Sequence, residues 1–222
     1  MGHVMTICAF IIDLLLLDVT PLSFGVGVIG EVFSVVIPRN TPIPTKKSKI
    51  YSTIRDYQTC VNVNVYQGER TRSTDNHLLG TFTISGIPPA PKGVAELEHY
   101  FEIDTNGILT VTSEILSTGK TEKLTITNVN GRLSKDEIER MIEDADKYKQ
   151  EDQEFKKKAD AFNALEDCIY NMKNKIKNMR KGSGLRKMED AIADTTKWVE
   201  HNQGASVDVV ERMMKDLKSI CL

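Results

Sequence analysis

The sequence contains few cysteines, and they are too far apart to suggest a disulfide framework or a zinc site. The 222 residues include four of them, Cys8, Cys60, Cys168 and Cys221, and no pair has a Cys-x-x-Cys or Cys/His spacing. Scattered thiols of this kind indicate a reducing compartment, so we expect a cytoplasmic protein. The sequence therefore predicts no metal site.

An excess of basic residues is also absent, as is a long hydrophobic run. The formal net charge is -2, with no strongly basic stretch, which argues against a nucleic-acid partner. The apolar run over residues 8–17 is too short to span a bilayer and contains Asp13. No Lys or Arg precedes this run, as a signal peptide would require. We therefore expect neither a nucleic-acid nor a membrane partner.

No arrangement of residues suggests catalysis. Gly25, Gly27 and Gly30 have the spacing of a dinucleotide fingerprint, but a strand pattern follows them, where that fingerprint needs a helix. The four histidines are isolated from one another, which excludes a recognisable triad or metal cluster. His99 lies in a strand pattern, and we expect it on a sheet face with its hydrogen bonds satisfied.

Residues 19–130 show the short, β-branched segments of an antiparallel sandwich. The clearest alternation is Val61-Asn-Val63-Asn-Val65, which predicts a strand with one wet face. Asp104-Thr-Asn-Gly107 predicts a tight hairpin turn. Many short strands separated by such turns favour a sandwich. The predicted strands cover 32–37, 49–53, 60–66, 81–85, 97–103, 108–111 and 123–127.

The hydrophobic period changes from 2 to about 3.6 after Gly131, which predicts helices over residues 131–222. Ser134 and Glu137 have the spacing of a capping box, followed by one long helix of about 45 residues. Gly182 and Gly184 end it, a second helix continues to about Gly204, and a third begins after Ser206. Their apolar stripes predict a small bundle. The expected fold class is thus an α+β protein with a β-sandwich (19–130) followed by a helical region (131–222), preceded by a hydrophobic segment (1–18).

Six motifs occur in one order, and together they resemble the C-terminal half of a 70-kDa heat-shock protein chaperone of the eukaryotic cytosolic type. They are Leu14–Leu22, Ile37–Lys47, Gln67–Arg70, Gly86–Gly93, Phe101–Leu109 and Gly131–Arg140. The resemblance runs from about Asp13 to Cys221. It implies an interdomain linker, a β-sandwich that binds extended hydrophobic peptides, and a helical lid, without the ATPase domain of the family.

The resemblance also implies roles for particular residues. The peptide-binding residues would be Val26, Val28, Ile29, Tyr51, Ile54, Val61, Val63 and Leu97, with Ile29 and Ile54 arching over the peptide. The lid would be latched by Asp56 and Lys92 on the sandwich together with Glu166 and Tyr170 on the long helix. The linker would be Leu14, Leu15, Leu16, Leu17 and Asp18.

Some positions depart from the family pattern. Glu31 stands where the family has a glycine whose backbone needs a positive φ, at a cost of about 1 kcal/mol. Ile29 and Ile54 make both arch positions branched aliphatics, which predicts a more apolar arch. The sequence ends at Cys221-Leu222, without the acidic C-terminal signal that binds tetratricopeptide co-chaperones in the family.

These observations predict a chaperone module that holds hydrophobic segments of unfolded polypeptides, is not an enzyme and takes no cofactor, with ATP assigned to a missing domain. J-domain co-chaperones and the ATPase domains of relatives are further expected partners. Two alternatives remain open. The chain could be a regulator or decoy of full-length relatives, or a degenerate truncated product with weak or no peptide binding.

Overall fold

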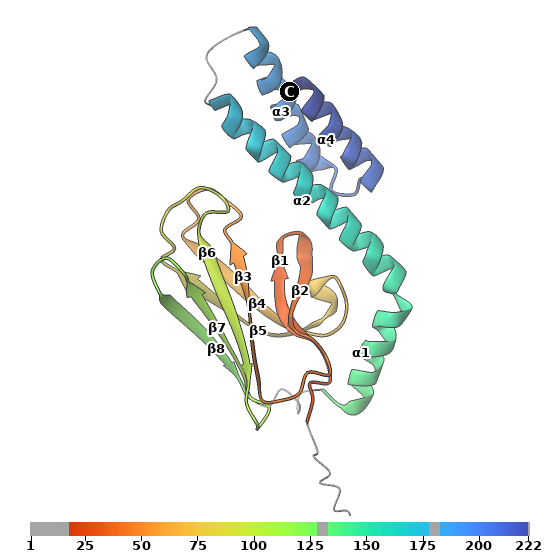
Figure 1. Cartoon of the computed structure of the whole chain (residues 1–222). Coiled ribbons are helices and arrows are strands. Elements are labelled where there is room, and N and C mark those ends of the chain that lie inside the picture. Colours follow the sequence, from red (N-terminus) through yellow and green to blue (C-terminus); the bar gives the residue numbers. More distant parts are fainter. Residues whose placement is uncertain (1–17, 128–132, 178–182, 222) are drawn as a thin grey trace, which may run out of the picture.

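The computed structural model describes residues 18–127, 133–177 and 183–221. Over these residues, strands occupy the first range and helices the other two. Figure 1 shows the helices running along one side of the β region and then across one end of it. The change of hydrophobic period in the sequence corresponds to this change of structure.

Two four-stranded antiparallel sheets make up the β region. The first has the strand order β2-β1-β4-β5 and the second has the order β3-β6-β7-β8. The strands are β1 (Phe24–Val28), β2 (Val32–Ile37), β3 (Thr45–Ser52), β4 (Cys60–Gln67), β5 (His77–Ser85), β6 (Glu96–Ile103), β7 (Leu109–Ile115) and β8 (Lys120–Ile126). All the predicted strands are present, β2 with the predicted ends and the others with shifted ends, and β1 is additional.

Alternation along β4 shows why these segments form sheets with one dry face. Val63 and Val65 are almost fully buried, whereas the alternating residues Asn62 and Asn64 face outward. The two asparagines accept hydrogen bonds from Thr83 and Thr81 on the neighbouring strand β5. A strand with this pattern presents its apolar side chains to one core and its amides to water.

The hydrophobic core contains side chains from both sheets. Phe24, Val26 and Val65 from the first sheet pack in one cluster with Phe101 and Val111 from the second. Burial of these side chains from water on both inner faces is the main force holding the sheets together. The fold is therefore α+β, with two antiparallel sheets and separate helices.

The long helix expected after Ser134 is divided in two, so the prediction of one continuous helix was wrong. The helices are α1 (Lys135–Lys147), α2 (Lys149–Lys177), α3 (Ser183–His201) and α4 (Val207–Cys221). The predicted capping box is confirmed, because Ser134 accepts a hydrogen bond from the Glu137 amide and the Glu137 carboxylate accepts one from Ser134. Tyr148 separates α1 from α2, with φ -96° and ψ 14°.

The C-terminal part of α2 forms a bundle with α3 and α4. Phe162 and Leu165 from α2 share a core with Ile192 from α3 and with Val210 and Leu217 from α4. This core confirms the expected packing of three apolar stripes. None of the helices in the described ranges has the length and apolar character needed to cross a membrane.

Candidate functional site

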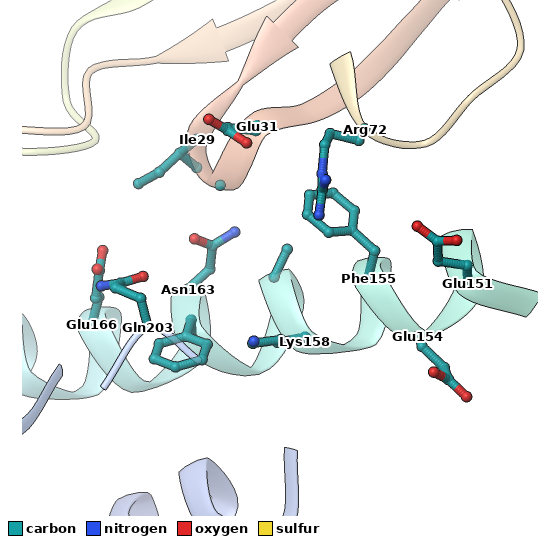
Figure 2. Close-up of a pocket in the computed structure, with 13 residues that line it drawn as sticks. Ile29, Glu31, Arg72, Glu151, Glu154, Phe155, Lys158, Asn163, Glu166 and Gln203 are labelled. Carbon is teal, nitrogen blue, oxygen red and sulfur yellow. The ribbon is translucent and has the colours of Figure 1, made fainter. Parts of the chain in front are cut away.

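The turn between β1 and β2 faces α2 across a cleft. The turn is a short 3-10 segment, Ile29–Glu31, and a Cβ placed on Gly30 would lie 3.4 Å from the Ala159 Cβ of α2. Figure 2 shows Ile29 and Glu31 on one side of the cleft and Asn163 and Phe155 on the other. The β1–β2 turn thus lies close to the middle of α2.

A cavity of about 610 Å³ opens on one side of this turn. Nearly half of the residues that line it are charged, among them Glu31, Glu151, Glu154 and Lys158. The Arg72 guanidinium lies over the Phe155 ring, 4.5 Å from its centroid, and joins the β region to α2 at this end.

A second cavity, of about 500 Å³, opens on the other side of the turn. Ile29 and Ile54 line it from the β region, and Asn163 and Glu166 line it from α2. Because Ile29, Asn163 and Glu166 line both cavities, the two adjoin and form one cleft along α2. The exposed fractions of Ile29 and Ile54 are 37% and 42%, which leaves apolar surface available in the cleft.

The other predicted peptide-binding residues lie deeper. Val28, Tyr51 and Val61 are half-buried against the main core. Val26, Val63 and Leu97 are at most 2% exposed and are part of the core itself. In this structure Ile29 and Ile54, the residues expected to arch over a peptide, face α2, and the expected pocket residues pack in the β region.

Hydrogen bonds connect the far part of α2 to the loops of the β region. The Tyr170 hydroxyl donates to Asp56 Oδ1 at 2.7 Å, and the Lys92 backbone amide donates to the same oxygen at 2.8 Å. The Lys92 amide and, second, the Tyr170 hydroxyl lower the pKa of Asp56. The Lys92 ammonium contacts Asp167 Oδ1 at 2.6 Å. Three of the four predicted latch residues, Asp56, Lys92 and Tyr170, thus meet, with Lys92 contributing its backbone amide. The Lys92 side chain pairs with Asp167 instead of with Glu166, which lines the cleft.

A second connection, at the start of α2, was not expected from the sequence. Asp152 accepts hydrogen bonds from Arg70 Nε and Nη2 at 3.0–3.1 Å and from the Thr71 amide at 2.9 Å. The hydrogen bonds with Asp152 hold the pKa of Arg70 above its usual value. Arg70 also lies 4.6 Å from the centroid of the Tyr148 ring, at the junction of α1 and α2. The only signal in the sequence was that Arg70 lies in the motif Gln67–Arg70, and this motif did not identify Asp152 as the partner of Arg70.

The expected linker lies mostly outside the described residues. Leu14, Leu15, Leu16 and Leu17 lie outside the described residues. Asp18 is exposed, and its backbone carbonyl accepts a hydrogen bond from the Ile43 amide.

Two antiparallel sheets, a helical arm across one end of them and a cleft of mixed polar and apolar lining between sheets and arm define a class of proteins with room for a ligand under the arm. The family model described as "Hsp70 protein" matches residues 2–222. The chain therefore belongs to the Hsp70 family.

Two curated relatives have the same family name. The chain is 46% identical over 211 residues to "Heat shock 70 kDa protein" of Penicillium citrinum, an alignment that covers 94% of this chain and 42% of that protein. It is 45% identical over 213 residues to "Heat shock cognate 70 kDa protein 3" of Dictyostelium discoideum, covering 94% of this chain and 34% of that protein. The chain thus spans less than half the length of these relatives.

The family match corrects the narrower assignment expected from the sequence. That assignment limited the resemblance to Asp13–Cys221, identified this stretch as the C-terminal half of the family and took the ATPase domain to be missing. The match to the family instead begins at residue 2 and runs to residue 222. The statements that the protein is not an enzyme and takes no cofactor depended on that assignment, and they are corrected with it. The family is one of ATP-hydrolysing chaperones, so ATP is the cofactor that membership implies.

A site for ATP would need backbone amides that face the phosphate groups and ligands for a metal ion. Gly25, Gly27 and Gly30 lie in β1 and in the turn to β2, where no helix N-terminus offers its amides to a phosphate group. Within the described ranges, no group of three or more His, Cys, Asp or Glu side chains could hold a metal ion. These residues do not fit a triphosphate, and no catalytic step is assigned to them.

Proposed function

We propose that this member of the Hsp70 family holds extended hydrophobic segments of unfolded polypeptides in the cleft between the β region and α2. The observation that carries the proposal is the pair of exposed isoleucines, Ile29 and Ile54, which face α2 across the second cavity. In this proposal residues 19–130 form a peptide-binding sandwich, and residues 131–222 form a lid over it.

Apolar contacts and backbone hydrogen bonds together suit such a ligand. An extended peptide can hydrogen-bond to exposed strand ends and loops while its side chains enter apolar pockets. Burying one Leu-sized side chain against Ile29 and Ile54 contributes about 1.5–3 kcal/mol. This amount corresponds to modest affinity, so slow release depends on a cover that stays closed.

Polar contacts on both sides of the cleft support the role of α2 as that cover. Arg70 and Asp152 hold the beginning of α2, and Asp56 with Tyr170 holds its far part. The Asp56–Tyr170 contact is exposed and individually weak, so the far part of α2 can open without unfolding the β region. The buried residues Val26, Val63 and Leu97 would then form the floor of the site, with Val28, Tyr51 and Val61 above them.

The test is fluorescence anisotropy with a labelled, Leu-rich, extended peptide. We expect Ile29→Asp and Ile54→Asp each to weaken binding by about tenfold or more, because each places a carboxylate where the peptide side chain would pack. Ile50→Asp is the matched control, since Ile50 is 53% exposed on β3 and lines neither cavity. Equal losses at positions 50 and 54, or no loss at positions 29 and 54, would contradict the proposal.

For the whole protein, chaperone action, cooperation with J-domain co-chaperones and a cytoplasmic location are proposals that follow from the family. Binding of unfolded polypeptides is the part of this set that the described cleft can test directly.

A further inference from the structure

The core of the β region contains a pair of polar side chains that no sequence pattern explains. His99 on β6 is 4% exposed, and Ser113 on β7 is fully buried. The two are register partners, so they lie side by side on the inner face of the second sheet. Neither His99 Nδ1 nor Ser113 Oγ has a hydrogen-bond partner among the described residues. The expectation that His99 would have its hydrogen bonds satisfied was therefore wrong for this nitrogen.

The neighbours of His99 on β3 connect it to the edge between the two sheets. The Tyr51 ring stacks on the imidazole with centroids 4.8 Å apart. The Tyr51 hydroxyl donates to Ser34 Oγ on β2 at 3.0 Å, and the ammonium of Lys49, the register partner of His99, donates to the same oxygen at 2.9 Å. The Ser34 hydroxyl on β2 thus connects the first sheet to Lys49 and Tyr51, the two side chains next to His99.

The charges around His99 do not favour a proton on it. Lys49 and Tyr51 are the titratable groups on β3 beside it, and Ser113 faces it from β7. Glu98 and Tyr100, its neighbours along β6, point to the opposite face of the sheet. Burial is the one cause that lowers the pKa of His99, from 6.5 to about 4. The folded β region therefore holds the neutral imidazole.

We propose that His99 makes the peptide cleft sensitive to acid: a proton on its imidazole disrupts the contact of Tyr51 with Ser34 and weakens peptide binding. This proposal rests on the proposed function, since Tyr51 and Leu97, which lie beside His99 on the same face, are proposed peptide-binding residues. An imidazolium ion would be buried with no acceptor for its Nδ1 proton and next to the Lys49 side chain, and opening the sheet edge would admit water to it.

The direction and size of the effect follow from linkage. The packed state favours the neutral imidazole of His99. The contribution of this neutral form to the stability of the packed state is therefore complete above pH 6.5 and is lost as the pH falls from 6.5 toward 4. In an opened state, His99 would have the ordinary histidine pKa. The ratio of opened to packed protein should then be up to roughly 30-fold higher at pH 5 than at neutral pH. Peptide affinity should fall by a factor within that limit.

The test measures peptide anisotropy between pH 7.5 and 5 for the wild type, His99→Leu and the control His77→Gln. We expect affinity to fall several-fold in the wild type and in His77→Gln, and less than twofold in His99→Leu. A fall in His99→Leu that equals the wild-type fall would overturn the proposal. Absence of binding at pH 7.5 in the wild type would instead contradict the proposed function.

A second measurement remains valid even if His99→Leu fails to fold. The imidazole C–H signals of His99 in the wild-type protein are titrated by NMR with and without peptide. Because linkage is reciprocal, bound peptide must lower the titration midpoint of His99. An unchanged midpoint would overturn the proposal.

Discussion

The buried ion pair between Arg70 and Asp152 should control how firmly α2 is held. The exposed fractions of the two side chains are 13% and 10%, so water screens the pair little. In Asp152→Asn the shape is kept, but Arg70 loses the charge that faces it and retains Asp75, at 3.3 Å, as its acidic neighbour. Removing one partner of a buried pair costs about 3–5 kcal/mol, and the remaining hydrogen bonds place this variant near the lower value.

A loss of about 3 kcal/mol corresponds to roughly a hundredfold change in an equilibrium constant. Amide hydrogen exchange should show it as a fall of this size in the protection of the first turns of α2. Amides near Leu217 in the bundle core should keep their protection, because α2, α3 and α4 share that core. The same variant should release bound peptide faster than the wild type.

The matched control is Glu139→Gln on α1. Glu139 pairs with Lys135 at 3.6 Å, but both side chains are more than half exposed, so its removal should cost less than about 0.5 kcal/mol. The double variant Arg70→Met with Asp152→Leu should be less destabilised than Asp152→Asn, because neither charge of the buried pair remains and Asp75, which loses Arg70, is 31% exposed. Protection in Asp152→Asn that falls no further than in Glu139→Gln would refute the reasoning.

Three further predictions follow from single contacts. Glu31→Gly should raise the free energy of unfolding by about 1 kcal/mol in thermal or urea denaturation, because Glu31 has φ 58°; a lower stability would contradict the strain. Tyr170→Phe should speed peptide release several-fold in a stopped-flow chase, because one hydrogen bond to Asp56 contributes about 0.5–1.5 kcal/mol, and an unchanged rate would exclude a latch there. Ser134→Ala should lower hydrogen-exchange protection in the first turn of α1 by an amount equivalent to about 1 kcal/mol, and full protection would show that the cap contributes little.

The strands could be predicted because their pattern is local, but β1 could not. No strand was predicted over Gly25 and Gly27, whereas Gly25 is needed in a strand: a Cβ there would lie 2.1 Å from the Ser34 carbonyl oxygen. Close approach of two strands depends on the partner strand, which is not visible in a local pattern. The break at Tyr148 was missed for a similar reason, because no Gly or Pro marks it.

The site was predictable only in part. The resemblance indicated Asp56, Lys92 and Tyr170, and these side chains or their backbone groups do meet. It did not give Asp167, which lies one position beyond Glu166 and is the residue that contacts Lys92. Arg70 and Asp152 are 82 positions apart, and no spacing rule connects residues at that distance.

The break at Tyr148 makes the rest of the helical region a lever. Tyr170 lies about 33 Å along the helix from Tyr148 and Asp152 about 6 Å, at 1.5 Å per residue. A rigid rotation about Tyr148 that displaces Asp152 by about 1 Å therefore displaces Tyr170 by about 6 Å. Under the proposed function, in which α2 covers the cleft, Asp152 can stay within reach of Arg70 while Tyr170 loses Asp56. Opening would then begin at the far end of α2, where a small rotation near Tyr148 produces the larger displacement.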